Sequence, residues 1–69
     1  MTTLPERLQL LKEKRNLMQK DIAAGLGIPL RTYQRYEYGE REPQASVVAD
    51  MARFFQVSAD YLLGLSDRE

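Results

Sequence analysis

The sequence contains no cysteine and no histidine among its 69 residues. The absence of cysteine excludes disulfides and thiolate chemistry, and the absence of both residues excludes the usual zinc sites. No run of about 18 apolar residues occurs, so no membrane-spanning helix is predicted. The first residues do not combine a charged segment with an apolar stretch, and we therefore expect no secretion signal. These absences predict a cytoplasmic chain with no metal and no cofactor.

Catalytic chemistry also has few candidates in this sequence. Besides the missing histidine and cysteine, there is no glycine-rich loop of the kind that holds phosphates. The acidic residues fall mostly on the predicted outer faces of helices. We therefore expect no catalytic residues and a protein that is not an enzyme.

The formal net charge is zero, which taken alone argues against a protein that binds nucleic acid. The charges are unevenly distributed, however. Residues 1–36 contain seven basic and three acidic residues, a balance of +4, whereas residues 37–69 contain three basic and seven acidic residues, a balance of −4. A positive face on the first half can attract phosphate although the whole chain is neutral. The alternative is that the surface charges are segregated by chance.

The stretch from Gln19 to Glu37 has the pattern of two short helices joined by a tight turn. Apolar residues at positions i, i+1 and i+4 give the first of these helices a single apolar face. Gly27 suits the left-handed conformation that commonly follows a helix end, and Pro29 presets φ for the next helix. This pattern predicts a compact helix-turn-helix whose second helix turns its polar face outward.

Three further helices are expected around this unit, in a single all-α domain over residues 1–69. The first follows Thr3 as its N-cap and ends near Arg15. Another covers about Ala45 to Phe55 and has apolar residues at the i, i+3, i+4 and i+7 spacing of a core face. The last begins after Ser58 as its N-cap and closes at Gly64.

The downstream residues extend the pattern beyond the helix-turn-helix itself. The combined pattern consists of Leu17, Gln19, Ile22-Ala23, Leu26-Gly27-Ile28, Tyr36-Glu37, Gly39, Arg41-Glu42-Pro43, Val57-Ser58 and Asp60-Tyr61-Leu62-Leu63-Gly64. It resembles the Cro/C1-type helix-turn-helix family, the lambda-repressor-like or XRE-type regulators, over about residues 7–64. The resemblance implies a five-helix fold in which helices two and three form the DNA-reading unit, followed by a tail at residues 65–69.

The resemblance also implies which residues would contact double-stranded DNA. The base-facing positions of the recognition helix are occupied by Leu30, Arg31 and Arg35. Arginine can bind guanine O6 and N7 bidentately, and leucine can contact a thymine methyl group. The alternative for the two arginines is that they are ordinary surface charges exposed to solvent. The residues expected to contact the DNA backbone are Gln19, Lys20, Thr32, Gln34 and Arg41.

Three positions depart from the family pattern. Met18 and Pro29 stand where serine or threonine is usual, and Met18 cannot cap the helix that follows, at a cost of about 1 kcal/mol. Tyr33 stands where an aliphatic residue is usual, and its hydroxyl must reach a partner or solvent. The family often pairs a basic residue of the first helix with the glutamate after the aromatic residue. We therefore expect a partly buried ion pair between Lys12 and Glu37.

Members of the family often dimerise through the C-terminal helix, and a chain of this length buries too little surface to be very stable alone. We expect a homodimer, with a monomer as the alternative. The residues expected at the dimer contact are Pro43, Ala59, Tyr61 and Leu65. In such a dimer the two recognition helices would lie about 34 Å apart and face half-sites one helical turn apart.

Two functions of different classes remain for such a domain. The first is a bacterial or phage transcriptional repressor that binds a short palindromic operator in the nucleoid. The second is an antitoxin-like or scaffold module that keeps the fold but binds DNA weakly or not at all. Binding that weakens steeply with salt would favour the first, because contacts to phosphates release counterions. The sequence indicates no small-molecule ligand.

Overall fold

The computed structural model describes residues 2–69, and Met1, at which the predicted domain begins, lies outside the described residues. Residues 2–69 form helices and no strand, which confirms the predicted all-α fold. The helices are α1 (Leu4–Lys14), α2 (Gln19–Leu26), α3 (Leu30–Glu37), α4 (Ala45–Phe55) and α5 (Ala59–Leu62). The boundaries lie close to those predicted, because local signals mark most of the helix ends.

Capping hydrogen bonds stabilise the first turns of α2 and α5. The Ser58 hydroxyl accepts a hydrogen bond from the amide of Tyr61 at 3.0 Å, as expected for the N-cap of α5. Met18 offers no side-chain cap to α2, but its own amide donates to the Asp21 carboxylate at 3.0 Å. Asp21 thus supplies one half of a capping box. The cost expected from methionine at this position is therefore partly offset.

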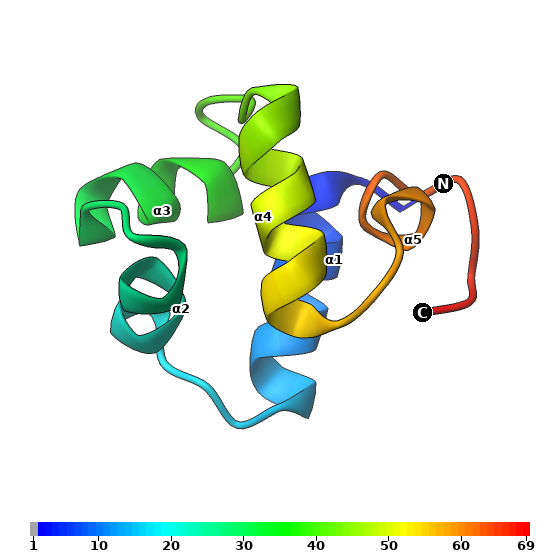
Figure 1. Cartoon of the computed structure of the whole chain (residues 1–69), viewed down its shortest axis with the longest axis horizontal. Helices are drawn as coiled ribbons and strands as arrows, with labels where there is room; N and C mark the ends of the chain where they lie inside the picture. Colours follow the sequence, from blue (N-terminus) through cyan, green and yellow to red (C-terminus); the bar gives the residue numbers. More distant parts are fainter. Residues whose placement is uncertain (1) are drawn as a thin grey trace.

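The helices surround one core, with α4 at the centre of the view in Figure 1. α2 packs on α3 and α4, α1 packs on α3 and α5, and α4 also packs on α5. The buried hydrophobic residues are Leu8, Leu11, Ile22, Ala23, Tyr33, Tyr36, Val48, Met51, Phe55, Val57, Tyr61 and Leu62. Because α3 rests on both α1 and α2, its inner face is covered while its outer face remains open.

Residues 65–69 contact α1, although the sequence pattern indicated only a tail there. The Arg7 guanidinium donates to the Asp67 carboxylate at 3.0 Å. Glu69 forms an ion pair with Lys14 near the other end of α1. This segment therefore brings acidic groups against basic residues of the first helix.

The sequence predicts neither a membrane-spanning helix nor a metal site within residues 2–69. None of the helices there combines the length and the apolar character needed to cross a membrane. No group of three or more acidic, histidine or cysteine side chains in the same residues is placed to hold a metal ion.

Candidate nucleic-acid interface

α2 and α3 are joined by the turn Gly27, Ile28 and Pro29. The Ile28 amide donates to the carbonyl of Ala23 at 3.0 Å and closes α2 around the left-handed Gly27, whose φ is +70°. The Pro29 carbonyl accepts hydrogen bonds from two amides in the first turn of α3, at 3.0 and 3.1 Å. Pro29 thus serves as the N-cap residue of α3. The predicted helix-turn-helix is confirmed.

The outer face of α3 carries the residues predicted to contact bases. Arg31 is exposed, Leu30 is 42% exposed and Arg35 is half-buried. Within residues 2–69, neither arginine side chain makes a hydrogen bond or an ion pair. The opposite face of α3 carries Tyr33 and Tyr36, which are buried in the core. Both guanidinium groups are therefore available to a ligand offered to the outer face.

A chain of three side chains joins the start of α2 to α3. Gln34 Nε2 donates to Gln19 Oε1 at 3.1 Å, and Gln19 Nε2 donates to the Tyr38 hydroxyl oxygen at 3.0 Å. Gln19 and Gln34 were predicted as DNA-backbone contacts, and the structure shows that they also bind each other. Sequence reasoning missed Tyr38. Its spacing of four from Gln34 and seven from Arg31 would have placed it on the same helix face.

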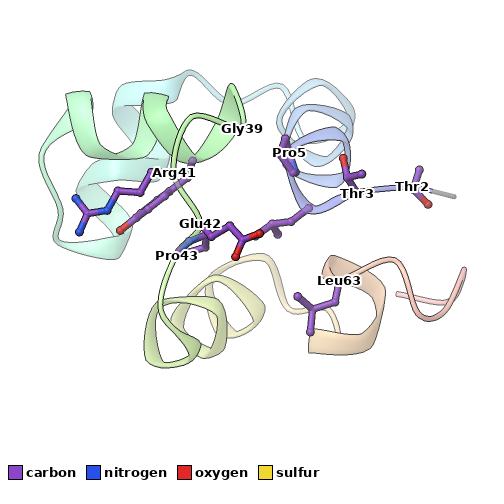
Figure 2. Close-up of a pocket in the computed structure, with 10 residues that line it drawn as sticks. Thr2, Thr3, Pro5, Gly39, Arg41, Glu42, Pro43 and Leu63 are labelled. Atoms are coloured by element: carbon purple, nitrogen blue, oxygen red, sulfur yellow. The ribbon is translucent and has the colours of Figure 1, made fainter.

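The other predicted backbone-contact residues lie beside this unit. Lys20 in α2 is exposed, Thr32 in α3 is half-buried, and Arg41 in the loop after α3 is exposed. In Figure 2 the Arg41 side chain extends away from Thr3 and Leu63, on the side of the loop nearer α3. Each of these residues belongs to α2, to α3 or to the loop that follows.

Ion pairs change the charge distribution that the sequence alone suggested. Acidic residues of the second half pair with four of the seven basic residues in the first half, namely Arg7, Lys12, Lys14 and Arg15. The basic residues of the first half that have no acidic partner within residues 2–69 are Lys20, Arg31 and Arg35. All three belong to the helix-turn-helix, so the unpaired basic side chains of residues 2–36 are confined to that unit.

A partly buried ion pair holds α3 against α1. Lys12 Nζ lies 2.6 Å from Glu37 Oε1, and Glu37 is only 1% exposed. Gln9 Nε2 adds a hydrogen bond of 2.9 Å to the backbone carbonyl of Glu37. The ion pair expected between Lys12 and Glu37 is confirmed. The orientation of α3 therefore depends on α1 as well as on α2.

Two buried polar atoms near this ion pair have no hydrogen-bond partner among residues 2–69: the Tyr33 hydroxyl and Glu37 Oε2. Tyr33 is 0% exposed, so its hydroxyl does not reach solvent, and the polar group beside it is the Glu37 carboxylate. The ring fills the space between helices and leaves the hydroxyl inside the core. Burial raises the pKa of the Tyr33 phenol well above its usual range, and the neighbouring Glu37 carboxylate raises it further.

The residues predicted for a dimer contact do not all lie at the surface. Tyr61 is 3% exposed, because its ring packs in the core with the Arg7 guanidinium 4.1 Å from the ring centroid. Its assignment to an intersubunit surface is wrong for this structure. Pro43 is half-buried, whereas Ala59 and Leu65 are exposed. Three of the four predicted residues therefore remain accessible.

Two hollows lie beside these accessible residues. The first, of about 370 Å³, lies between the start of α4 and α5 and is lined by Pro43, Ala45, Val48, Ala49, Ala59 and Leu63. The second, of about 390 Å³, lies between the start of α1, the loop after α3 and α5 (Figure 2), and shares Pro43 and Leu63 with the first. Sequence reasoning missed Leu63, although it follows Ala59 by four residues and thus shares its helix face.

Residues 8–62 match the model of a protein family described as Helix-turn-helix. The regulator AnsR of Bacillus subtilis is 39% identical over 59 residues, which cover 86% of this chain and 51% of AnsR. The cryptic phage CTXphi transcriptional repressor RstR of Vibrio cholerae is 33% identical over 57 residues, covering 83% of this chain and 51% of RstR. The chain spans about half the length of the curated relatives it matches.

Solved structures show the same fold. The P22 c2 repressor in complex with a synthetic operator superposes with a TM-score of 0.86 at 23% identity, covering 96% of this chain and all of that one. A transcriptional regulator from Listeria innocua superposes with a TM-score of 0.84 at 32% identity, covering 90% of this chain and 58% of that one. The chain therefore belongs to the helix-turn-helix family, in the Cro/C1-type or lambda-repressor-like group that its sequence pattern resembles.

Proposed function

We propose that this domain binds double-stranded DNA sequence-specifically and is the DNA-reading part of a transcriptional repressor acting at the bacterial nucleoid. The observation that carries the proposal is the outer face of α3, where Arg31 and Arg35 have no partner within residues 2–69. The relative RstR is named a transcriptional repressor, and the P22 c2 repressor is described with an operator. Both support the proposal.

In the proposed complex α3 lies in the major groove. Arg31 and Arg35 each bind O6 and N7 of a guanine, and Leu30 contacts a thymine methyl group. Lys20 and Arg41 contact phosphates as positive charges, which sets the register of the domain without reading sequence. Uncharged contacts to the backbone come from Gln19, Thr32 and Gln34.

Selection of bound sequences from random duplex DNA tests this proposal. Arg31→Ala and Arg35→Ala are each expected to relax preference at one operator position by about 1–3 kcal/mol. Arg53→Ala is the matched control, because Arg53 is exposed on α4 and pairs with Asp50 at 2.8 Å. The control should retain both preference and affinity. An equal loss at every position would contradict base reading by α3.

The salt dependence of binding separates this function from its alternative. Contacts to phosphates release counterions, so the affinity of a DNA-binding domain falls steeply as salt rises. An antitoxin-like or scaffold module without DNA affinity would show no such binding. Wild-type protein that selects no duplex at low salt would reject the proposed function.

We also propose that the domain acts on its operator as a homodimer. The proposed contact uses the accessible residues Pro43, Ala59 and Leu65 together with Leu63, which lines both apolar hollows. A two-fold dimer would place its two α3 helices about 34 Å apart and bind a palindromic site. Half-sites at another spacing would contradict this arrangement.

A further inference from the structure

We infer that Tyr38 is an uncharged anchor to the DNA backbone, at which its phenolic O–H donates to a phosphate oxygen. This inference rests on the proposed DNA binding and adds a contact that sequence reasoning did not provide. Tyr38 is the C-cap residue of α3. The argument depends on where its ring lies, how its hydroxyl is held and which acceptor the hydroxyl suits.

The Tyr38 side chain lies on the outer face of α3. Arg31, Gln34 and Arg35 precede it by seven, four and three residues, and these spacings put all four side chains on one side of a helix. Tyr38 is 57% exposed, whereas Tyr33, Tyr36 and Tyr61 are at most 6% exposed. Core packing therefore explains the other tyrosines but not this one.

The Tyr38 hydroxyl is already oriented in the structure. Gln34 donates to Gln19, and Gln19 Nε2 donates to the Tyr38 oxygen at 3.0 Å. A phenol carries one proton besides its acceptor lone pairs, so a hydroxyl that accepts from Gln19 keeps its own proton to donate. Within residues 2–69 that proton has no acceptor. The chain of hydrogen bonds therefore runs in one direction and ends on a free donor.

An anionic oxygen is the acceptor that suits this donor best. Hydrogen bonds to a charged acceptor are stronger than neutral ones, and donation along a chain polarises the last O–H further. Lys20 follows Gln19 in the sequence, and Arg35 lies on the same face of α3 as Tyr38. Neither has an acidic partner within residues 2–69, so both can attract an anion to the Tyr38 hydroxyl. Phosphate oxygens of the DNA backbone are anionic acceptors, and they lie on the DNA surface that α3 is proposed to face.

The test compares wild type with Tyr38→Phe in the full 69-residue chain. Fluorescence anisotropy would measure the Kd for a selected operator and for a random-sequence duplex at several salt concentrations. Removing the hydroxyl should raise Kd about three- to tenfold on both duplexes by the same factor. The slope of log Kd against log salt should not change, because a neutral donor releases no counterion. Lys20→Ala, the charged comparison, should reduce that slope by about one.

A second variant tests the role of Gln19. In a Gln19→Ala background, Tyr38→Phe should raise Kd less than about twofold, because the hydroxyl is no longer oriented. A full effect in that background, an unchanged Kd for Tyr38→Phe alone, or a loss on the selected operator without a loss on the random duplex would overturn the inference. Wild type that binds neither duplex would reject the proposed function itself, which separates the two failures. Equal thermal unfolding of Tyr38→Phe and wild type confirms that the fold is intact.

Discussion

Among single residues, the Tyr33 hydroxyl is unusual because it is buried and has no hydrogen-bond partner among residues 2–69. A buried polar group without a partner lowers stability, and its removal breaks no hydrogen bond seen among residues 2–69, since Glu37 Oε2 beside it is also unpaired there. Tyr33→Phe should therefore leave the free energy of unfolding at pH 7 unchanged or raise it by up to about 1 kcal/mol. Urea unfolding would measure the difference. A clear loss would show that the hydroxyl has a partner in solution.

The same variant should change the dependence of stability on pH. The pKa of Tyr33 is raised in the folded chain, chiefly by burial. The neutral phenol is therefore favoured by folding, and this contribution is complete below the unfolded pKa of about 10 and is lost as pH rises above it. Wild type should lose stability faster than Tyr33→Phe above about pH 10. Parallel curves for the two proteins would contradict a raised pKa.

A second single-residue prediction concerns Glu37 and its ion pair with Lys12. Glu37→Gln should lower the free energy of unfolding by about 1–3 kcal/mol, because the carboxylate that Lys12 contacts at 2.6 Å is lost inside the fold. The expected loss is below that of a fully buried pair, because the Lys12 side chain is 24% exposed. Asp50→Asn, which removes the exposed pair with Arg53, should change stability by less than about 0.5 kcal/mol. Equal effects of the two variants would show that burial of Glu37 is unimportant.

Among the elements, α3 is supported from two sides, by side-chain hydrogen bonds to α2 and by the Lys12–Glu37 pair to α1. This support matters for function because base reading requires side chains held in a set orientation.

The residues that follow the helices differ in type, although several share the left-handed backbone conformation. Gly27 follows α2 in the left-handed conformation, but Asn16 and Gln56 adopt the same conformation at φ values of +58° and +57°.

Gln56 offers the test of these helix ends. A left-handed conformation costs most residues about 1–2 kcal/mol, whereas asparagine tolerates it and glycine adopts it freely. Gln56→Gly should raise stability by about 0.5–1 kcal/mol after the added freedom of the unfolded chain is included. Asn16→Gly, the matched control at the end of α1, should give a smaller gain. Thermal unfolding would measure both, and a larger gain for Asn16→Gly would contradict the argument.

Across the whole molecule, the second half of the chain neutralises basic residues in α1 and at its C-cap, and leaves those of the helix-turn-helix unpaired within residues 2–69. A chain of zero net charge thereby presents a positive outer face on α3. A separate surface, which includes the exposed Leu63 and Leu65, lies around α5 and the residues after it. In Figure 1 α3 and α5 lie on opposite sides of α4, so the base-reading face and the centre of the proposed dimer contact are separate. The two proposed interactions approach each other only in the loop after α3, where Arg41 and Pro43 line one hollow.

Leu63→Glu tests the surface around α5. A charge in an apolar contact is costly, so the variant should weaken self-association on a palindromic operator while leaving the fold intact. Leu10→Glu on α1 is the matched control, since Leu10 is 47% exposed and Leu63 is 46% exposed. Sedimentation with and without operator DNA would measure the effect. A wild-type protein that remains monomeric on its operator would contradict the proposed dimer.

Local patterns in the chain were enough to predict the helices and the helix-turn-helix. Gly27, Ser58 and the apolar spacings act within a few residues, so their effects can be derived without knowing the rest of the structure. The resemblance added the ion pair between Lys12 and Glu37, which the geometry confirms. The base contacts assigned to Arg31 and Arg35 stay predictions that DNA binding must test.

Other features depend on residues that are distant in the chain and meet only in the folded molecule. The sequence pattern assigns Tyr61 to a dimer surface, whereas in the folded molecule α1 places Arg7 over its ring. The position of Tyr38 beside Gln19 likewise requires α2 and α3 to be packed together. Which basic residues stay unpaired is decided in the same way, because an ion pair depends on a distance of a few ångströms that spacing along the chain does not determine.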